Sequence, residues 1–243
     1  MRDYQKETDS RVSFLRDVLK KSGATGFVFG NSGGKDSALV GVLCKMATEK
    51  TLGLVLPCMG TSNKDCADAL AVASLFQMES RVIDLTETNA EFIAAISQEA
   101  NLTEASLINI APRLRMAALY AVAASGNRLV VGTDNRSEIY TGYFTKWGDG
   151  AYDVNPIADL TVTEVYEFLT FLGAPEFLFH KAPSAGLFEG QTDEMEMGVT
   201  YRAIDAYITS GYADDADRLI IERHHDRSEH KRRMPLLYSN TAP

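Results

Sequence analysis

The chain has few of the residues that stabilise disulfide-rich, zinc-binding or membrane proteins. Only three of its 243 residues are cysteine, at positions 44, 58 and 66, and none forms a CxxC pair. A zinc site or a disulfide framework therefore has little support, and we expect reduced thiols. No segment approaches the roughly 18 to 20 consecutive apolar residues that span a bilayer, and residues 1–15 contain no apolar signal-peptide core. We expect a cytoplasmic protein with no membrane partner.

The chain also lacks an excess of positive charge. It carries 24 Lys and Arg against 33 Asp and Glu, a formal net charge of -9. This balance argues against a general nucleic-acid surface, although a local basic pocket remains compatible with it. The 45% hydrophobic content supplies enough residues for a core. The length fits one α/β domain, and we expect residues 1–243 to form a single domain.

Short apolar runs alternate with helix-like segments through the first half of the chain. We expect strands at 26–30 ("GFVFG"), 52–57, 81–85 and 128–133, and helices at 36–48, 64–77, 87–99 and 105–125. Pro112 limits how far upstream the last helix extends without a kink. Continuously apolar strands separated by helices indicate a parallel sheet that is covered on both faces. The fold class is therefore α/β, with a doubly wound, Rossmann-like sheet.

The second half of the chain has a different composition. The segment 141–156, "TGYFTKWGDGAYDVNP", is rich in glycine, aromatic and charged residues, and we interpret it as a functional loop. Helices are expected to return at 163–172 and 193–210. A basic cluster, "HHDRSEHKRR" at 224–233, closes this part of the chain. On composition alone, such a cluster is typical of a solvated tail.

A glycine-rich stretch, "GNSGGKDS" at 30–37, follows the first expected strand directly. Ligands of open parallel sheets bind beyond the carboxyl ends of the strands. Glycines allow close backbone approach, and the following helix offers free N–H groups to an anion. The stretch matches neither the Walker A pattern nor the GxGxxG fingerprint. It predicts a phosphate-binding loop, the alternative being a structural turn in which Asp36 caps the helix.

Residues 32–37, "SGGKDS", resemble the SGGxDS signature of the PP-loop ATP pyrophosphatases, which form adenylates and release pyrophosphate from ATP. That motif does not choose among the members of the superfamily. Six further segments do, because their order and spacing are similar to those of ammonia-dependent NAD synthetases: "RLRM" (113–116), "GTDNRSE" (132–138), the 141–160 loop, "KAPSAGL" (181–187), "GQTDEMEMGVTY" (190–201) and "EHKRR" (229–233). The resemblance covers nearly the whole chain from about residue 10.

The resemblance implies an adenine nucleotide alpha hydrolase-like fold and a ligase. Deamido-NAD would attack the α-phosphate of ATP to give an acyl-adenylate and pyrophosphate, and ammonia would then displace AMP to give NAD. The resemblance also implies a homodimer. A fused glutaminase domain is not expected, because only about thirty residues precede the glycine loop.

Carried over residue by residue, the resemblance assigns the ATP contacts to Gly30, Ser32, Gly33, Gly34, Lys35, Asp36, Ser37, Thr133 and Ser184. Asp36 and Glu138 would face Mg²⁺, which favours a few carboxylates together with phosphate oxygens. Asp36, Glu138 and Lys35 are the expected catalytic residues. Read without the resemblance, Glu138 could be an ordinary solvated helix residue.

The resemblance assigns deamido-NAD binding to Arg113, Lys146, Asp153, His230 and Lys231. Cations suit this role because they make charge-assisted hydrogen bonds to a pyrophosphate. Read alone, Arg113 could flank a helix and Lys146 could be a loop charge. No general base is assigned for ammonia; Asp149 and Asp153 are both open.

The chain departs from the family pattern at two positions. Val162 stands where family members generally carry a lysine near the ATP phosphates, and Val55 where many bacterial members carry an arginine. Lys35 could replace the missing cation. These departures leave two alternatives open: a paralogue that adenylates and amidates a different carboxylate, and a nucleotide-binding protein without turnover.

Overall fold

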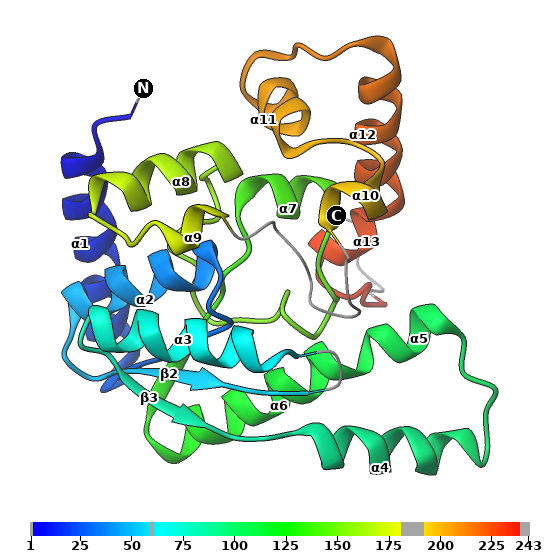
Figure 1. Ribbon diagram of the computed structural model, residues 1–243, viewed down its shortest axis with the longest axis horizontal. Coiled ribbons are helices and arrows are strands. Elements are labelled where there is room, and N and C mark those ends of the chain that lie inside the picture. Colours follow the sequence, from blue (N-terminus) through cyan, green and yellow to red (C-terminus); the bar gives the residue numbers. More distant parts are fainter. Residues whose placement is uncertain (1, 59–60, 181–191, 239–243) are drawn as a thin grey trace.

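The computed structural model describes residues 2–58, 61–180 and 192–238. Its centre is a sheet of four parallel strands in the order β3-β2-β1-β4. The strands are β1 (Gly26–Gly30), β2 (Thr51–Val55), β3 (Glu79–Val82) and β4 (Arg128–Val131) (Figure 1). The chain runs outward from β1 to β3 and then returns to the other side of β1. The loops after β1 and β4 therefore lie side by side at a topological switch point, where ligands bind in such sheets.

Strand β1 is buried on both faces because its side chains alternate between two cores. Phe27 and Phe29 pack into one apolar cluster, and Val28 between them packs into the other. All three side chains are fully buried. The expectation of a parallel sheet covered on both faces is confirmed.

Helices cover each face of the sheet. The helices α1 (Tyr4–Ser22), α2 (Lys35–Ala47), α3 (Asn63–Leu75) and α8 (Val162–Phe171) contribute side chains to the core that contains Phe27. On the other face, Met116, Leu119 and Ala123 of α6 (Ile110–Ser125) pack against Val28. Helix α4 (Thr86–Ser97) follows β3 (Figure 1).

The helix expected at 105–125 is divided in two. Helix α5 (Glu104–Ile108) ends before Asn109, and α6 begins after it, with Pro112 as its third residue, where the missing N–H costs no hydrogen bond. By length and composition alone, the stretch Glu104–Ser125 is long and apolar enough to cross a membrane, and only part of it is buried. The expectation that no segment is apolar enough to span a bilayer did not anticipate this stretch. Core helices can be as long and as apolar as this stretch, and α6 packs on one face of the sheet.

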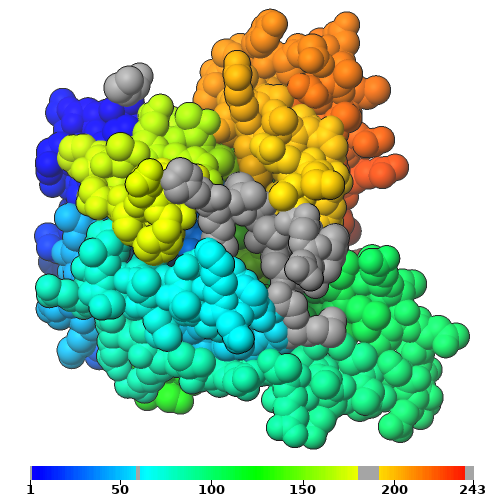
Figure 2. Space-filling view, in the orientation of Figure 1, coloured from blue at the N-terminus to red at the C-terminus, as the bar shows by residue number. Residues whose placement is uncertain are grey.

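The chain after β4 forms a third apolar cluster. The helices of this region are α7 (Arg136–Thr141), α9 (Phe177–His180), α10 (Asp193–Met197), α11 (Tyr201–Ser210), α12 (Asp215–Arg227) and α13 (Glu229–Arg232). Of these, α9 packs through Leu178 into the core that contains Phe27. The helix expected at 193–210 is interrupted at Gly198, whose φ of +72° ends α10. Figure 2 shows the orange C-terminal helices as a lobe beside the sheet core. Helices α7, α12 and α13 were not expected.

Candidate active site

The chain turns sharply between β1 and α2, and Gly33 permits this turn. Its φ of +71° lies in the left-handed region, which residues other than glycine rarely adopt. A Cβ at this position would lie 2.7 Å from the backbone nitrogen of Ala69 on α3. The Asn31 side chain holds the turn, because it donates to the Ala69 carbonyl oxygen (2.8 Å) and accepts from the Gly33 N–H (3.3 Å). The loop backbone therefore lies against α3.

The amino end of α2 presents a set of groups suited to phosphate. Gly34 is the N-cap and makes no side-chain capping bond. The hydroxyl oxygens of Ser32 and Ser37 lie 3.1 Å apart at this end of the helix. Uncapped N–H groups, the positive end of the helix dipole and two hydroxyl groups can together bind an anion. The residues predicted to contact ATP between 30 and 37 form one continuous segment, from the end of β1 to the first turn of α2.

Asn135 joins the two carboxylates that were predicted to face a metal ion. Its side-chain amide donates to Asp36 Oδ1 over 3.1 Å, and its backbone N–H donates to Glu138 Oε2 over 2.9 Å. This is possible because β4 pairs directly with β1. Asn135 also caps α7, in a capping box with Glu138. The fold thus brings Asp36 and Glu138 to the same small region.

Negative charge is in excess in this region. Burial, and then the charge of Asp36, raise the pKa of Glu138 well above its usual range, although Lys35 opposes the shift. Burial also raises the pKa of Asp134, with further contributions from Asp149 and Glu138. A cation bound nearby would favour the ionised forms and lower both pKa values. The charge balance therefore fits a divalent cation.

The donor set fits Mg²⁺ in one specific way. Across residues 2–58, 61–180 and 192–238, no group of three or more His, Cys, Asp or Glu side chains is arranged to hold a metal ion. Mg²⁺ does not need such a cage, since it binds through one or two carboxylates, waters and substrate phosphates. Asp36 and Glu138 could supply the two carboxylates.

Two of the predicted deamido-NAD-binding lysines fasten separate segments to each other. Lys146, in the loop after α7, donates from Nζ to the carbonyl oxygen of His230 on α13. Lys231 on α13 donates from Nζ to the carbonyl oxygens of Gly142 (2.8 Å) and Phe144 (2.7 Å). We call this reciprocal arrangement of Lys146 and Lys231 the lysine clamp. Each lysine binds the segment that carries the other.

Arg113 extends the same group of cations. Its Nε donates to the carbonyl oxygen of Lys146 over 3.3 Å. Burial lowers the pKa of Lys231, and Arg113 and Arg232 act in the same direction, against the opposing charge of Asp149. Arg113, Lys146, His230 and Lys231 thus come together from three distant parts of the sequence. A cluster of positive charge of this kind favours an anionic ligand.

The other predicted residues are Asp153, Thr133 and Ser184. Asp153 lies beside β4, where its carboxylate accepts from the backbone N–H of Val130 (2.8 Å) and from the Tyr120 hydroxyl (3.3 Å). Thr133 is half-buried in the segment after β4, next to Asp134. Ser184 lies outside the described residues.

Two polar residues were missed by the sequence interpretation. Asn135 was inside a recognised motif, and its position three residues before Glu138 is the signal of a capping box. Arg115 donates from Nε to the carbonyl oxygen of Leu56 (3.1 Å) and from Nη2 to Thr61 Oγ1 (2.9 Å). It holds the segment between β2 and α3 at the ligand-binding edge of the sheet. No spacing in the sequence distinguishes Arg115 from Arg113.

Val162 occupies an apolar position at the start of α8. Its side chain is 4% exposed and belongs to the third apolar cluster together with Tyr201. Tyr166 is one helical turn further along α8 and shares the same face. The Nζ atom of Lys35 lies 5.8 Å from the ring centre of Tyr166 and 5.7 Å from that of Tyr201. Position 162 therefore carries no positive charge, and Lys35 places one against Tyr166 and Tyr201 close by.

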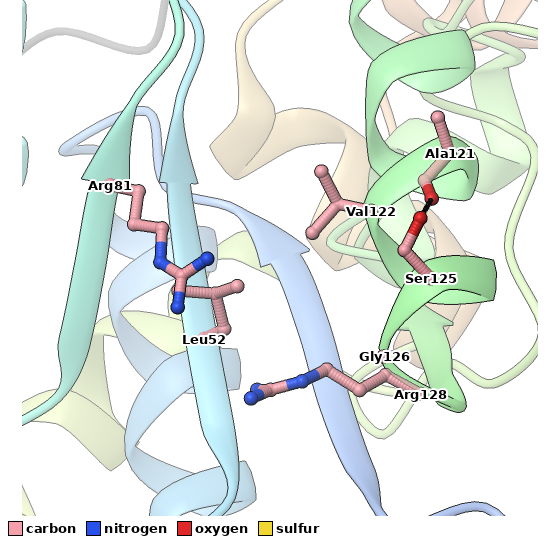
Figure 3. A pocket seen from close by; sticks show the side chains of 7 residues that line it. All are labelled: Leu52, Arg81, Ala121, Val122, Ser125, Gly126 and Arg128. Carbon is pink, nitrogen blue, oxygen red and sulfur yellow. Dashed lines mark hydrogen bonds between the residues drawn. The ribbon is translucent and has the colours of Figure 1, made fainter.

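A cavity of about 390 Å³ lies at the opposite edge of the sheet (Figure 3). Leu52 and Arg128, near the amino ends of β2 and β4, line it with the end of α6. The guanidinium groups of Arg81 and Arg128 lie 2.6 and 3.9 Å from the Glu79 carboxylate. Because the glycine loop follows the carboxyl end of β1, this cavity is separate from the candidate site.

Sequence comparison places the chain among known proteins. Residues 7–235 match the family model described as NAD synthase. A protein of Carboxydothermus hydrogenoformans named NH(3)-dependent NAD(+) synthetase is 44% identical over 239 residues, which cover 96% of this chain and 97% of that protein.

Two solved structures share the fold over nearly their whole length. The structure of an NMN synthetase from Francisella tularensis superposes with a TM-score of 0.94 at 38% identity, covering 99% of this chain and 100% of the other. An NH3-dependent NAD synthetase from Campylobacter jejuni has a TM-score of 0.82 at 31% identity, covering 98% and 100%.

Proposed function

This chain belongs to the NAD synthase family, and we propose that it uses ATP to amidate deamido-NAD with ammonia, giving NAD, AMP and pyrophosphate. The observation that carries the proposal is the juxtaposition of a phosphate-binding loop with two carboxylates across Asn135. The full-length similarity to proteins named NH(3)-dependent NAD(+) synthetase supports it. The chain is thus a ligase that forms a C–N bond.

In the first step, the nicotinate carboxylate attacks the α-phosphate of ATP and pyrophosphate leaves. The amino end of α2, with Ser32 and Ser37, holds the phosphates and offsets negative charge as the pyrophosphate departs. Asp36 and Glu138 would hold Mg²⁺, which when bound supplies further positive charge at the phosphates. Thr133 and Ser184 complete the proposed nucleotide contacts. Catalysis here consists chiefly of holding two anionic substrates in line.

In the second step, ammonia attacks the acyl carbon and AMP leaves. No side chain is assigned as a base for ammonia; Asp149 and Asp153 are both open, and of the two Asp149 is the less exposed. Its Oδ1 accepts from the Thr145 N–H over 3.0 Å. Burial raises the pKa of Asp149, so its basicity is increased.

The group formed by Arg113, Lys146, Lys231 and the neighbouring His230 is proposed to bind the pyrophosphate of deamido-NAD. Its lysines bind backbone carbonyl oxygens in the described structure. A dinucleotide pyrophosphate is a stronger partner for an ammonium than a neutral carbonyl, since both groups are charged. Asp153 is retained as a proposed contact near the dinucleotide.

We propose further that the enzyme is a homodimer. Phe92 on α4 is 46% exposed and Tyr120 on α6 is 37% exposed, and the apolar stretch 104–125 is mostly unburied within one chain. Large exposed apolar surfaces mark interfaces. Phe92→Glu should reduce the mass measured by light scattering to that of one chain, whereas Phe14→Glu, at an equally exposed phenylalanine on α1, should not. An unchanged mass for Phe92→Glu would contradict the placement of the interface.

The chain is also proposed to act as a single domain in the cytoplasm. Helix α8 supports the first point, because Phe168 packs into the sheet core and Val162 into the third cluster. Cys44, Cys58 and Cys66 are all free thiols, as suits a reducing compartment.

A second candidate substrate is nicotinate mononucleotide, the acid that corresponds to NMN. The observation in its favour is the TM-score of 0.94 to the structure titled NMN synthetase, against 0.82 for the Campylobacter jejuni NAD synthetase. The chemistry is unchanged, because both substrates carry the same nicotinate carboxylate. They differ in the adenylate half, which only the dinucleotide has.

The test is a mass-resolved assay with ATP, Mg²⁺ and ammonium and with each acid in turn. Equal amounts of amide, AMP and pyrophosphate with deamido-NAD establish the main proposal. A higher kcat/KM with nicotinate mononucleotide establishes the second candidate. ADP and orthophosphate as products would contradict both.

A further inference from the structure

Lys35 is a buried cation in an unfavourable place. It is the first residue of α2, and only 7% of its surface is exposed. The amino end of a helix disfavours positive charge, and a buried ammonium costs stability unless it is paired. The stability of α2 therefore does not account for a lysine here.

The Lys35 ammonium is paired with one carboxylate, lies against two aromatic rings and is close enough to Glu138 to interact with its charge. Its Nζ lies 2.8 Å from Asp36 Oδ2, and the rings of Tyr166 and Tyr201 face it from α8 and α11. Tyr201 is 3% exposed, and its hydroxyl donates to Asp193 Oδ2 over 3.0 Å, which fixes the ring. The ammonium is held between a carboxylate and two aromatic faces.

Asp36 therefore has two cations to pair with. It is paired with Lys35 in the described structure, and under the proposed function it also faces Mg²⁺. Two cations at one carboxylate repel each other, so binding of the second weakens the first pairing. The cation–π contacts remain when the pairing with Asp36 is lost, and they keep the ammonium close to the amino end of α2.

We propose that Lys35 exchanges partners during the reaction, a step that rests on the proposed function. The ammonium neutralises Asp36 while the site is empty of nucleotide, and it pairs with the pyrophosphate part of ATP once Asp36 is engaged by the metal ion. Tyr166 and Tyr201 hold it within reach of both partners. Lys35 is then both a competitor of the metal and a ligand of the pyrophosphate.

The partner exchange predicts opposite effects on two ligands when Lys35 is replaced by methionine. Without a competing charge, Mn²⁺, measured by EPR without nucleotide, should bind about fivefold more tightly. Pyrophosphate, measured by calorimetry with Mg²⁺ present, should bind roughly tenfold more weakly because one charge-assisted contact is lost. Lys35→Arg should restore most of the pyrophosphate affinity. Lys45→Met, on the same helix and paired with Glu49, should change neither.

A structural role alone would weaken both ligands together, and that result, or no change in either, would overturn the proposal. Melting temperatures identify any variant that is unfolded, and Lys35→Gln then replaces methionine in the same comparison. The turnover assay of the wild type decides the proposed function separately. If the Mn²⁺ and pyrophosphate affinities shift in opposite directions but the wild type forms no amide, the partner exchange is retained and the proposed function is rejected. If the wild type forms amide but the two affinities do not shift in opposite directions, the proposed function is retained and the partner exchange is rejected.

Discussion

The two halves of the candidate site are built in different ways. The nucleotide half is built on one contiguous segment, from the end of β1 to the first turn of α2, whose backbone is fixed by Gly33 and Asn31. Asn135 adds Glu138 of α7 to it, and negative charge is in excess there. The dinucleotide half is assembled from α6, the loop after α7 and α13, and its cations are held by backbone carbonyl oxygens. The nucleotide half depends chiefly on the geometry of one turn, with Asn135 as the bridge to α7, and the dinucleotide half is formed by contacts between segments. The two should therefore respond differently to substitution.

The largest effect is expected at the acidic side of the nucleotide half. Asp36→Asn removes a charge at the proposed metal and phosphate contact, and we expect kcat to fall by roughly 10²- to 10³-fold. Release of pyrophosphate from ATP measures this directly. Asp17→Asn, on α1, is the control and should retain full activity. Wild-type kinetics in Asp36→Asn would remove the aspartate from the mechanism.

A comparison of Gly33 with Gly23 distinguishes the cost of a left-handed backbone from the cost of close contact with a neighbouring helix. Both have positive φ, +71° and +73°, but a Cβ at Gly23 meets nothing within 4 Å, whereas one at Gly33 meets the backbone of Ala69. We expect Gly23→Ala to lower the free energy of unfolding by about 1 to 2 kcal/mol, the cost of the left-handed conformation alone. Gly33→Ala should cost more and should also abolish nucleotide binding. Equal urea midpoints for the two variants would show that the contact with α3 is unimportant.

Substitutions in the lysine clamp test the dinucleotide half. Lys231→Met should raise the KM for deamido-NAD roughly 10- to 100-fold while leaving the KM for ATP near its wild-type value. Lys146→Met should act in the same direction. Because each lysine binds the segment of the other, the double variant should lose less substrate-binding free energy than the sum of the losses in the two single variants. Additive changes in the free energy of substrate binding would indicate that the lysines act independently.

The smallest expected effect is on pH dependence. The pKa values of Asp134 and Glu138 are raised in the folded protein, so the folded state binds more protons than the unfolded state above the ordinary carboxylate pKa. The free energy of unfolding should therefore fall as the pH rises from the ordinary carboxylate range through the raised values. Asp134→Asn should make this slope shallower in urea denaturation of the ligand-free protein, and Asp17→Asn should not. A slope unchanged by Asp134→Asn would mean that its carboxyl does not contribute.

The glycine-loop part of the nucleotide half could be predicted from the sequence because its information is local, whereas the Asn135 contact with Asp36, 99 positions away, could not. An apolar strand, a glycine loop and an apolar helix follow one another within residues 26–47, and the structure has them in that order. Strand and helix periods are set by neighbouring residues. The helix boundaries predicted for 36–48 and 163–172 agree within one residue with those of α2 and α8.

The dinucleotide half could be predicted only as a set of residues. The bonds of Lys146 and Lys231 join residues 84 and 89 positions apart, and their acceptors are carbonyl groups that every residue has. No sequence pattern identifies such an acceptor. Helices α7 and α13 are also short, at 6 and 4 residues, and tertiary contacts rather than intrinsic propensity stabilise them. Both properties depend on the finished fold.

The hydrogen bond between Asn135 and Asp36 joins residues 99 positions apart. During synthesis, the glycine loop leaves the ribosome long before its partner, and loop closure over such a distance is a slow, entropically costly step. The glycine loop therefore exists first without its Asn135 partner. Asn135 can join Asp36 to Glu138 only when β4 docks beside β1, so the two carboxylates come together at that stage of folding.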